Sequence, residues 1–241
     1  MKKFKNTFKR VETKYLLTQA QYHFIQEAMR THMRPDQFSE SQIANIYYDT
    51  PNYYLIRQSL EKPTFKEKLR VRSYVAEPTS QDTVYIELKK KVNKVVYKRR
   101  LQSSVENAVA YLEGNHDVIQ ASQIKDEINW FTQIYEHLQP TMYIYYDRKS
   151  YIGIEDTDLR ITFDTNLIYR WDDLSLTKGV YGEPLLPEDK VLMEVKVAGG
   201  YPIWLIGILT EMQVYKSSFS KYGAAYKQMK KARVALNEYI V

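Results

Sequence analysis

The sequence predicts an α+β protein in which eight mostly antiparallel strands form a closed sheet with helices packed outside it. Three observations support this fold class. Segments rich in Val, Ile and Tyr alternate apolar and polar residues, and capped helical segments lie between them. No low-complexity linker, composition break or internal repeat divides the 241 residues, so we expect a single domain over residues 1–241.

Alternation with a period of two residues predicts each strand, because successive side chains of a strand point to opposite faces. Between two of these segments, "NKV" at 93–95 predicts a hairpin turn, although Asn-Lys is a weaker signal than Asn-Gly. The predicted strands cover residues 8–16, 42–49, 65–75, 83–92, 94–102, 141–154, 158–165 and 190–197.

Capping residues predict where two of the helices begin and end. Thr18 precedes "QAQYHFIQEAMRTHM" as an N-cap, and "SVENAVAYLEG" runs from a Ser cap to Gly114. Three further helices are predicted within residues 121–138, 202–213 and 221–241.

Composition and charge restrict the class of protein. Hydrophobic residues make up 44% and charged residues 27%, as in soluble globular proteins. The net charge of +6 suggests an anionic partner. The absence of cysteine excludes disulfides and thiolate metal sites. The N-terminus has no apolar signal segment, and residues 201–214 fall short of the roughly 20 residues of a membrane span, so a cytoplasmic location is expected.

One face of several predicted strands is densely basic. In "FKEKLRVRSY" the residues Lys66, Lys68, Arg70 and Arg72 share a face. The neighbouring strands add, on their polar faces, Tyr85, Glu87, Lys89, Lys91, Lys94, Lys98, Arg100, Tyr146, Arg148, Arg160, Thr162 and Asp164. Arg binds phosphate with two parallel hydrogen bonds, Lys supplies point charges, and carboxylates are hard ligands for Mg²⁺ or Mn²⁺. The pattern predicts a site for a metal polyphosphate inside the sheet.

Three strands repeat a Glu-x-Lys pattern, in "RVETKYLL", "VYIELKKK" and "VLMEVKV". The simplest interpretation is a solvated sheet face laced with cross-strand ion pairs. Against it stands the run of four basic residues in "FKEKLRVRSY", which has no carboxylate on the same face of its strand. Such crowding of like charge is unfavourable without an anion.

Seven motifs, in order along the chain, resemble the triphosphate tunnel metalloenzyme superfamily and, within it, the VTC-type polyphosphate polymerase domain. They are "RVETKYLL", "YYDTPNYYLIRQSLEKPTFKEKLRVRSY", "YIELKKKVNKVVYKRR", "YYDRKSY", "LRITFDTN", "MEVKV" and "SFSKYGAAY". The resemblance covers nearly the whole chain. It implies an eight-stranded antiparallel tunnel that holds a triphosphate and a divalent metal.

The resemblance also implies roles for individual residues. The implied phosphate-binding residues are Lys14, Arg70, Arg72, Lys89, Lys98, Tyr146, Arg148, Arg160, Lys196, Ser220 and Lys221. The residues implied to be catalytic are Lys14, Arg70, Arg72, Lys89, Arg148, Lys196 and Lys221. Glu194 would hold Mn²⁺ or Mg²⁺, with Glu12 and Glu87 nearby. The start of a helix at Lys221 gives that position a physical reason as well, because helix N-termini favour anions.

One position departs from the broader CYTH branch of this superfamily, which opens with Glu-x-Glu-x-Lys. Here Arg10 replaces the first carboxylate, giving Arg-x-Glu-x-Lys. A cation at this position should weaken a second metal site. The Arg form is associated with VTC-type domains, which favours polymerisation over simple triphosphate hydrolysis.

The implied function is an ATP:polyphosphate phosphotransferase. Its partners would be ATP or triphosphate and polyphosphate, and a separate membrane subunit is compatible with the resemblance. Two alternatives stay open. One is a triphosphatase that acts on inorganic triphosphate, a nucleotide or an RNA 5′ end. The other is a non-catalytic binder of polyphosphate or nucleic acid, although carboxylates on the basic face disfavour nucleic acid.

Other motifs predict no chemistry. The four histidines, His23, His32, His116 and His137, show no metal-ligand spacing. No glycine-rich phosphate loop occurs, so a nucleotide would not be held in P-loop fashion.

Overall fold

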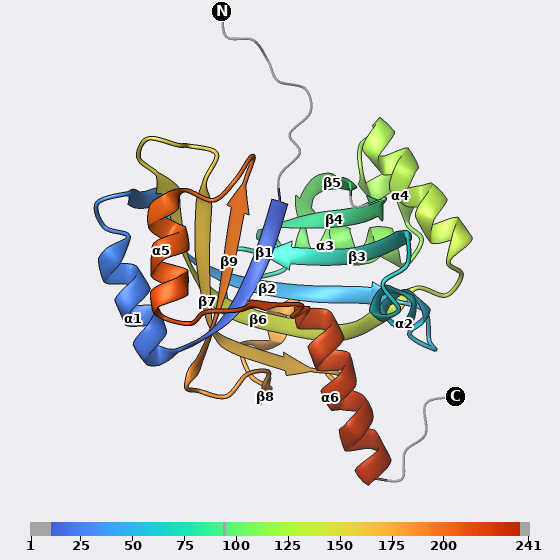
Figure 1. Cartoon of the computed structure of the whole chain (residues 1–241). Helices are drawn as coiled ribbons and strands as arrows, with labels where there is room; N and C mark the ends of the chain where they lie inside the picture. Colours follow the sequence, from blue (N-terminus) through green and yellow to red (C-terminus); the bar gives the residue numbers. More distant parts are fainter. Residues whose placement is uncertain (1–10, 94, 237–241) are drawn as a thin grey trace, which may run out of the picture. The chain divides into compact units, whose positions relative to one another are not determined.

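The computed structural model describes residues 11–93 and 95–236, which form an α+β fold (Figure 1). The strands are β1 (Val11–Thr18), β2 (Met33–Asp49), β3 (Phe65–Ser73), β4 (Thr83–Val92), β5 (Val95–Ser104), β6 (Gln139–Gly153), β7 (Arg160–Arg170), β8 (Glu183–Pro184), β9 (Lys190–Val197) and β10 (Lys216–Ser217). The helices are α1 (Gln19–Ala28), α2 (Tyr54–Leu60), α3 (Val105–Leu112), α4 (Gln123–Ile134), α5 (Ile203–Glu211) and α6 (Lys221–Ala235). No helix in these ranges combines the length and apolarity of a membrane span.

The prediction of a closed eight-stranded sheet is wrong. The described sheet has ten strands in the order β10-β1-β9-β7-β6-β2-β3-β4-β5, with β8 paired to β7 beside this path. Closure would require hydrogen bonds between the two end strands. In the described part of the chain β10 pairs with β1 instead, and its two residues are too few to form a ladder with β5.

The chain divides into two compact units, and each contains three separate segments of sequence. Within the described residues the first unit contains 11–41, 147–166 and 186–219. The second unit contains 42–146, of which residue 94 is not described, together with 167–185 and 220–236. Because the segments alternate along the chain, no single sequence boundary separates the units.

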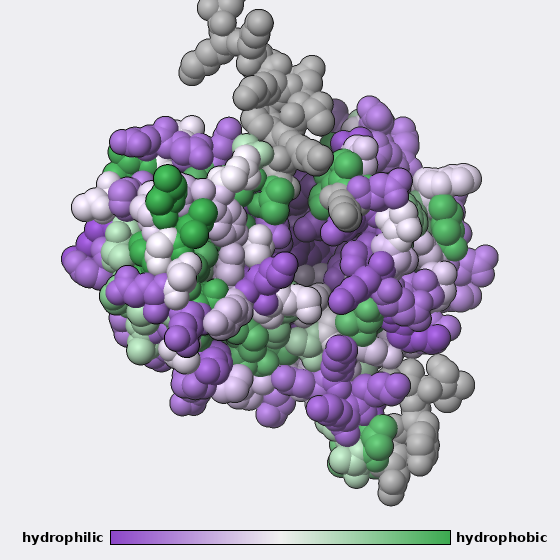
Figure 2. All heavy atoms as spheres, in the orientation of Figure 1, coloured by the Kyte–Doolittle hydropathy of each residue, from purple (hydrophilic) through white to green (hydrophobic). Residues whose placement is uncertain are grey.

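The core of the first unit lies on one face of β1, β9 and β7. Inward residues of these strands, such as Leu17, Met193 and Phe163, pack against α1 and α5. Figure 1 shows these two helices side by side. Figure 2 shows hydrophobic side chains gathered on α5, where Ile203 and Ile206 are exposed.

The core of the second unit lies on one face of β2, β3 and β4. Buried side chains of these strands, including Ile46, Val71 and Ile86, pack against α3 and α4. The residues between them along each strand must point to the other face. This alternation places the charged residues of β3 and β4 opposite the core.

Local capping confirms both helix starts predicted from the sequence. The hydroxyl of Thr18 accepts a hydrogen bond from the amide of Gln21, whose side chain accepts one from the amide of Thr18. Ser104 caps α3 by accepting from the amide of Asn107. The predicted hairpin is also confirmed, because Val92 pairs with Val95 and Asn93 has φ of 46°. The first residues of the predicted strand 8–16, Lys94, and the last residues of the predicted helix 221–241 lie outside the described residues.

A buried arginine holds the loop after β7. Arg170 is 3% exposed, and its guanidinium donates to backbone carbonyls of Asp173, Ser175, Gly179 and Tyr181 at 2.9–3.3 Å. A planar group with five donors suits this arrangement, whereas lysine cannot reach several carbonyls at once.

We expect Arg170→Met to lower the free energy of unfolding by about 2–4 kcal/mol, because four backbone carbonyls lose the hydrogen bonds that this buried guanidinium donates. Urea unfolding followed by tryptophan fluorescence measures this change. Arg30→Met is the matched control, because Arg30 is exposed and its ion pair with Glu27 lies at the surface. Equal stability of the two variants would contradict the assigned role.

Candidate functional site

Three cations surround a buried carboxylate in the first unit. Antiparallel pairing places Lys14 of β1 opposite Glu194 of β9, and Glu12 opposite Lys196. The Oε1 atom of Glu194 lies 3.2 Å from the Nζ of Lys14. Its Oε2 lies 3.4 Å from a guanidinium nitrogen of Arg148 and 3.7 Å from the Nζ of Lys196. We call these four residues the Glu194 cluster.

Register explains two of the three Glu-x-Lys patterns. When two antiparallel strands each carry Glu-x-Lys, each carboxylate meets the ammonium group of the other strand. The register places Glu12 opposite Lys196 and Lys14 opposite Glu194, and an ion pair of 3.2 Å joins Lys14 to Glu194. The cross-strand interpretation of the sequence therefore applies to β1 and β9, and it brings predicted phosphate ligands and predicted metal ligands together.

The carboxylate of Asp164 sets the position of Arg148. Asp164 is not among the site residues predicted from the sequence. Asp164 is fully buried and accepts two hydrogen bonds from Arg148, at 2.6 and 2.7 Å. This fork geometry fixes the plane of the guanidinium. The signal in the sequence was weak, because Asp164 simply continues the polar face of "LRITFDTN".

Arg160 is placed differently from the other predicted ligands of this unit. It pairs with Lys196 in the β7–β9 register, and its guanidinium forms an ion pair with Asp36 at 3.5 Å. Its Nε atom is buried and has no hydrogen-bond partner among the residues that the structure describes. Its guanidinium therefore retains a donor for a further acceptor.

A second carboxylate, in the other unit, contacts four cations. The side chain of Glu87 is 1% exposed. Its oxygens lie 2.8 Å from Arg70, 3.8 Å from Arg72, 2.7 Å from Lys98 and 2.9 Å from the Nε of Arg100. We call these five residues the Glu87 cluster. Burial opposes ionisation of Glu87, but the charges of Arg70, Arg72 and Lys98 outweigh it and hold the pKa of this carboxyl well below its usual range.

Residues of β2 and β6 orient the two arginines of β3. The Nε of Arg72 donates to Asn45 at 2.9 Å, and one of its terminal nitrogens donates to the hydroxyl of Tyr146 at 3.1 Å. Arg70 donates to the hydroxyl of Tyr47 at 3.0 Å. Despite burial, which raises it, the pKa of Tyr47 is lowered by the charges of Arg70, Lys68 and Arg72. Asn45 and Tyr47 could not be predicted as site residues from the sequence, because their pairing with β3 depends on register.

A row of three lysines crosses the same face. Lys68 of β3 pairs with Lys89 of β4, which pairs with Lys98 of β5. The next row pairs Lys66 with Lys91, and the pKa of Lys66 is lowered by burial and by neighbouring lysines. Cations directly opposite one another on a sheet are unfavourable, and a bound anion removes the penalty.

The last two predicted phosphate ligands lie at the start of α6. Ser220 accepts from the amide of Gly223 and from the Nζ of Lys68, both at 3.3 Å. Lys221 is buried, and its Nζ lies 4.4 Å from the centre of the Tyr146 ring. Ser220 therefore contacts Lys68, and Lys221 contacts Tyr146, whose hydroxyl binds Arg72 of the Glu87 cluster.

The predicted metal ligands differ in their fit to a divalent ion. In the described residues, no group of three or more His, Cys, Asp or Glu side chains could hold a metal. The oxygens of Glu87 already contact four cations, which makes it a poor metal donor. Glu194 and Glu12 share a contact with Lys14. One or two carboxylates suffice for Mg²⁺ when substrate phosphates and water complete its shell, so Glu194 with Glu12 fits such an ion.

Arg10 lies outside the described residues. The weakening of a second metal site by Arg10 therefore stays a prediction from the sequence.

Comparisons with known proteins identify the family and similar folds. The VTC domain family profile matches residues 9–230. No curated protein matches the chain. A candidate adenylate cyclase from Bacillus halodurans has a similar structure, with a TM-score of 0.53 and 14% identity over 88% of this chain and 93% of that one. At this identity the similarity supports the fold alone.

Two further solved structures resemble the chain more distantly. A protein from Pyrococcus horikoshii has a TM-score of 0.46 and 13% identity, over 91% of this chain and 99% of that one. A candidate adenylate cyclase from Vibrio parahaemolyticus has a TM-score of 0.45 and 12% identity, over 90% and 97%.

Proposed function

This chain belongs to the VTC domain family, and we propose that it is a polyphosphate polymerase that uses ATP. In the proposed reaction an oxygen of the terminal phosphate of a polyphosphate chain attacks the γ-phosphorus of ATP. A new P–O–P bond forms, the bond between the γ-phosphorus and the β–γ bridging oxygen breaks, and ADP leaves. Phosphoryl transfer of this kind needs positioning and charge neutralisation rather than a nucleophile from the protein.

The observation that carries the proposal is the lysine row formed by Lys68, Lys89 and Lys98. A polyphosphate chain carries negative charge on every phosphate, so a row of cations suits it better than a single site would. The arginines of the Glu87 cluster add planar forks for phosphate oxygens. We assign the phosphate-binding role to this polar face of β3, β4 and β5.

Glu87 has a positioning role in this proposal. Its contacts with four cations fix where their donors point, and its negative charge offsets part of their repulsion. The earlier assignment of Glu87 as a metal ligand stays an untested prediction. The contacts of Glu87 with four cations favour a role in positioning those cations over a role as a metal ligand.

In the first unit, Lys14, Arg148 and Lys196 are proposed to bind phosphate, with Asp164 orienting Arg148. Glu194, assisted by Glu12, would hold Mg²⁺ or Mn²⁺. A divalent ion supplies charge neutralisation at phosphate oxygens during transfer. The protein groups contribute fixed charges that need no rearrangement when the reaction occurs.

Phosphorus NMR of the products tests the function. We expect purified protein incubated with ATP and Mn²⁺ to produce ADP and the resonances of internal polyphosphate phosphates. Orthophosphate as the sole new phosphate would show a triphosphatase and contradict the proposal. Unchanged ATP, together with salt-sensitive binding of polyphosphate, would show a binding module.

The affinity of the protein for tripolyphosphate tests whether the lysine row binds phosphate. Two neighbouring lysines of β4 provide a test variant and a matched control. Lys89 belongs to the row, whereas Lys90 points to the other face and pairs with Glu67 at 3.3 Å. We expect Lys89→Gln to weaken binding about tenfold, a loss of about 1.4 kcal/mol, as a phosphate loses one cation. We expect Lys90→Gln to leave binding unchanged. Isothermal titration calorimetry at constant salt measures both, and equal losses would refute the assignment of this face.

A further inference from the structure

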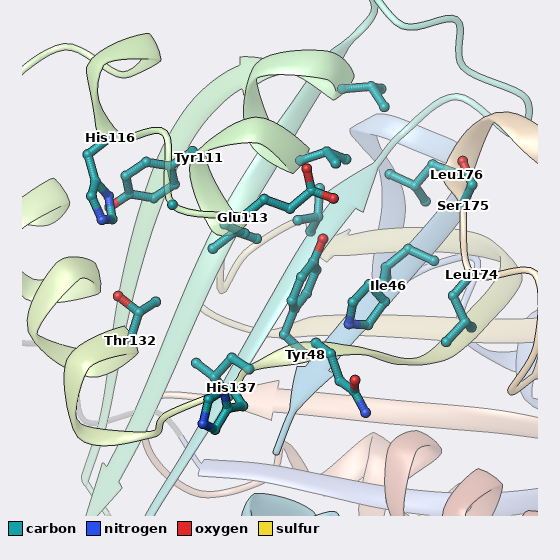
Figure 3. Close-up of a pocket in the computed structure, with 18 of the residues that line it drawn as sticks. Ile46, Tyr48, Tyr111, Glu113, His116, Thr132, His137, Leu174, Ser175 and Leu176 are labelled. Atoms are coloured by element: carbon teal, nitrogen blue, oxygen red, sulfur yellow. The ribbon is translucent and has the colours of Figure 1, made fainter. Parts of the chain in front are cut away.

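The second unit contains a cavity of about 660 Å³ on the side of the sheet that carries its core (Figure 3). Its lining comes from β2, β3, α3, the turn after α3, the end of α4, residues 137–140 at the start of β6, and residues 174–176. Ile46 and Tyr48 of β2 line it, whereas Asn45 and Tyr47 contact arginines on the opposite face. The cavity is therefore separate from the Glu87 cluster, and its volume suits a small organic molecule.

The charge of this cavity differs from that of the chain as a whole. The chain carries +6, yet among the residues that the structure describes no Lys or Arg lines the cavity, and Glu113 is the one carboxylate in the lining. Within the described part of the chain, no cation lies within ion-pairing distance of Glu113. An anion such as phosphate would find no partner there, whereas a cation would.

The end of α3 fixes the position of Glu113. The amide of Gly114 donates to the carbonyl of Tyr111, and that of Asn115 donates to the carbonyl of Ala110. These two bonds form a Schellman motif, which requires the left-handed conformation seen at Gly114, with φ of 108°. Glu113 is the last residue before this turn and lies on the cavity wall.

One tyrosine hydroxyl in the lining faces this carboxylate. Figure 3 shows the hydroxyl of Tyr48 directed toward Glu113. Burial, and then the charge of Glu113, raises the pKa of Tyr48, so its hydroxyl stays protonated at neutral pH. The hydroxyl of Tyr111 already contacts Asn129 and the carbonyl of Lys125. The remaining lining is mainly apolar, with Ile46, Val71, Val105, Leu174 and Leu176 among its members.

We propose that this cavity binds a small organic cation, an amine carried on an apolar ring. The ammonium group would pair with Glu113 and lie beside the hydroxyl of Tyr48. The ring would pack against the apolar lining, and the faces of Tyr48 and Tyr111 add favourable contacts for a cation. This ligand class is opposite in charge to the polyphosphate proposed for the other face, so the inference does not depend on the proposed function.

Calorimetric titration with two indole compounds tests the proposal. Tryptamine carries an ammonium group, and 3-indolepropionate carries a carboxylate on a similar ring. Both titrations are run in the same buffer at pH 8. We expect tryptamine to bind at least ten times more tightly than 3-indolepropionate.

Variants locate the binding. Glu113→Gln removes the charge of this exposed side chain and keeps its shape, so we expect tryptamine to bind about tenfold more weakly. Glu106→Gln is the matched control, because Glu106 is an exposed glutamate of the same helix outside the cavity lining. Lys89→Gln, on the other face, should leave tryptamine binding unchanged.

Three results would overturn the proposal. They are no binding of tryptamine, equal binding of 3-indolepropionate, and equal loss in the Glu113→Gln and Glu106→Gln variants. Each can occur whether or not the protein makes polyphosphate, so failure here is distinct from failure of the proposed function.

Discussion

Replacing Glu194 with glutamine is expected to lower the rate of polyphosphate synthesis by about 10²- to 10³-fold, the order of magnitude lost when one group that stabilises transition-state charge is removed. The variant loses the carboxylate proposed to hold the divalent ion. Phosphorus NMR of the products over time measures the rate. Glu188→Gln, at an exposed glutamate just before β9, is the matched control and should keep full activity.

Binding of tripolyphosphate without metal shows whether Glu194 acts in catalysis or is needed for folding. Glu194 lies among Lys14, Arg148 and Lys196, so its neutralisation leaves more positive charge for an anion. We expect Glu194→Gln to bind tripolyphosphate at least as tightly as the wild type when no metal is present. Weaker binding, or undiminished synthesis, would contradict the assignment of Glu194 as the metal ligand.

The second large effect is expected on stability. Glu87 is buried against four cations, and Glu87→Gln leaves those charges without their anion. Removing one partner from a buried ion pair costs about 3–5 kcal/mol, and we expect the free energy of unfolding to fall by that amount at pH 7. Glu127→Gln is the control, because Glu127 pairs with Arg99 at the surface and should cost less than about 1 kcal/mol.

The effect of Glu87→Gln should depend on pH. Because the pKa of Glu87 is held below its ordinary value of 4.5, the ionised carboxylate adds stability above that pH, and this stability is lost as pH falls toward the folded pKa. The stability difference between wild type and variant should therefore be constant from pH 7 to about 5 and shrink below 4.5. A difference that does not change between pH 5 and pH 3 would contradict a lowered pKa.

Strand faces could be predicted from the sequence because alternation depends only on local backbone geometry. The predicted strands 83–92 and 190–197 match β4 and β9. The basic face of β3 also followed from its sequence. The partners across strands did not, because register depends on which strands pair. The contacts of Arg70 with Tyr47 and of Arg148 with Asp164 were therefore missed.

Short elements were missed for a related reason. Helix α2 begins after Tyr53, which has φ of 58°, and its second and third amides donate to the side chain of Asp49 several residues earlier. This cap gives no local signal of the usual kind. Strands β8 and β10 have two residues each, too few to show a period. The prediction of a closed sheet was wrong because it assumed that eight long strands would complete the sheet.

The sequence by itself determined the α+β class, the long strands with their apolar and basic faces, and the capped helices, because each depends on residues close together in the chain. It also carried the motifs that place the chain in the VTC domain family. Only the tertiary structure decided how the charges pair, that Glu87 contacts four cations, and that a cavity containing Glu113 lies behind the basic face. These features join residues far apart in sequence, and strand register and helix packing bring them together.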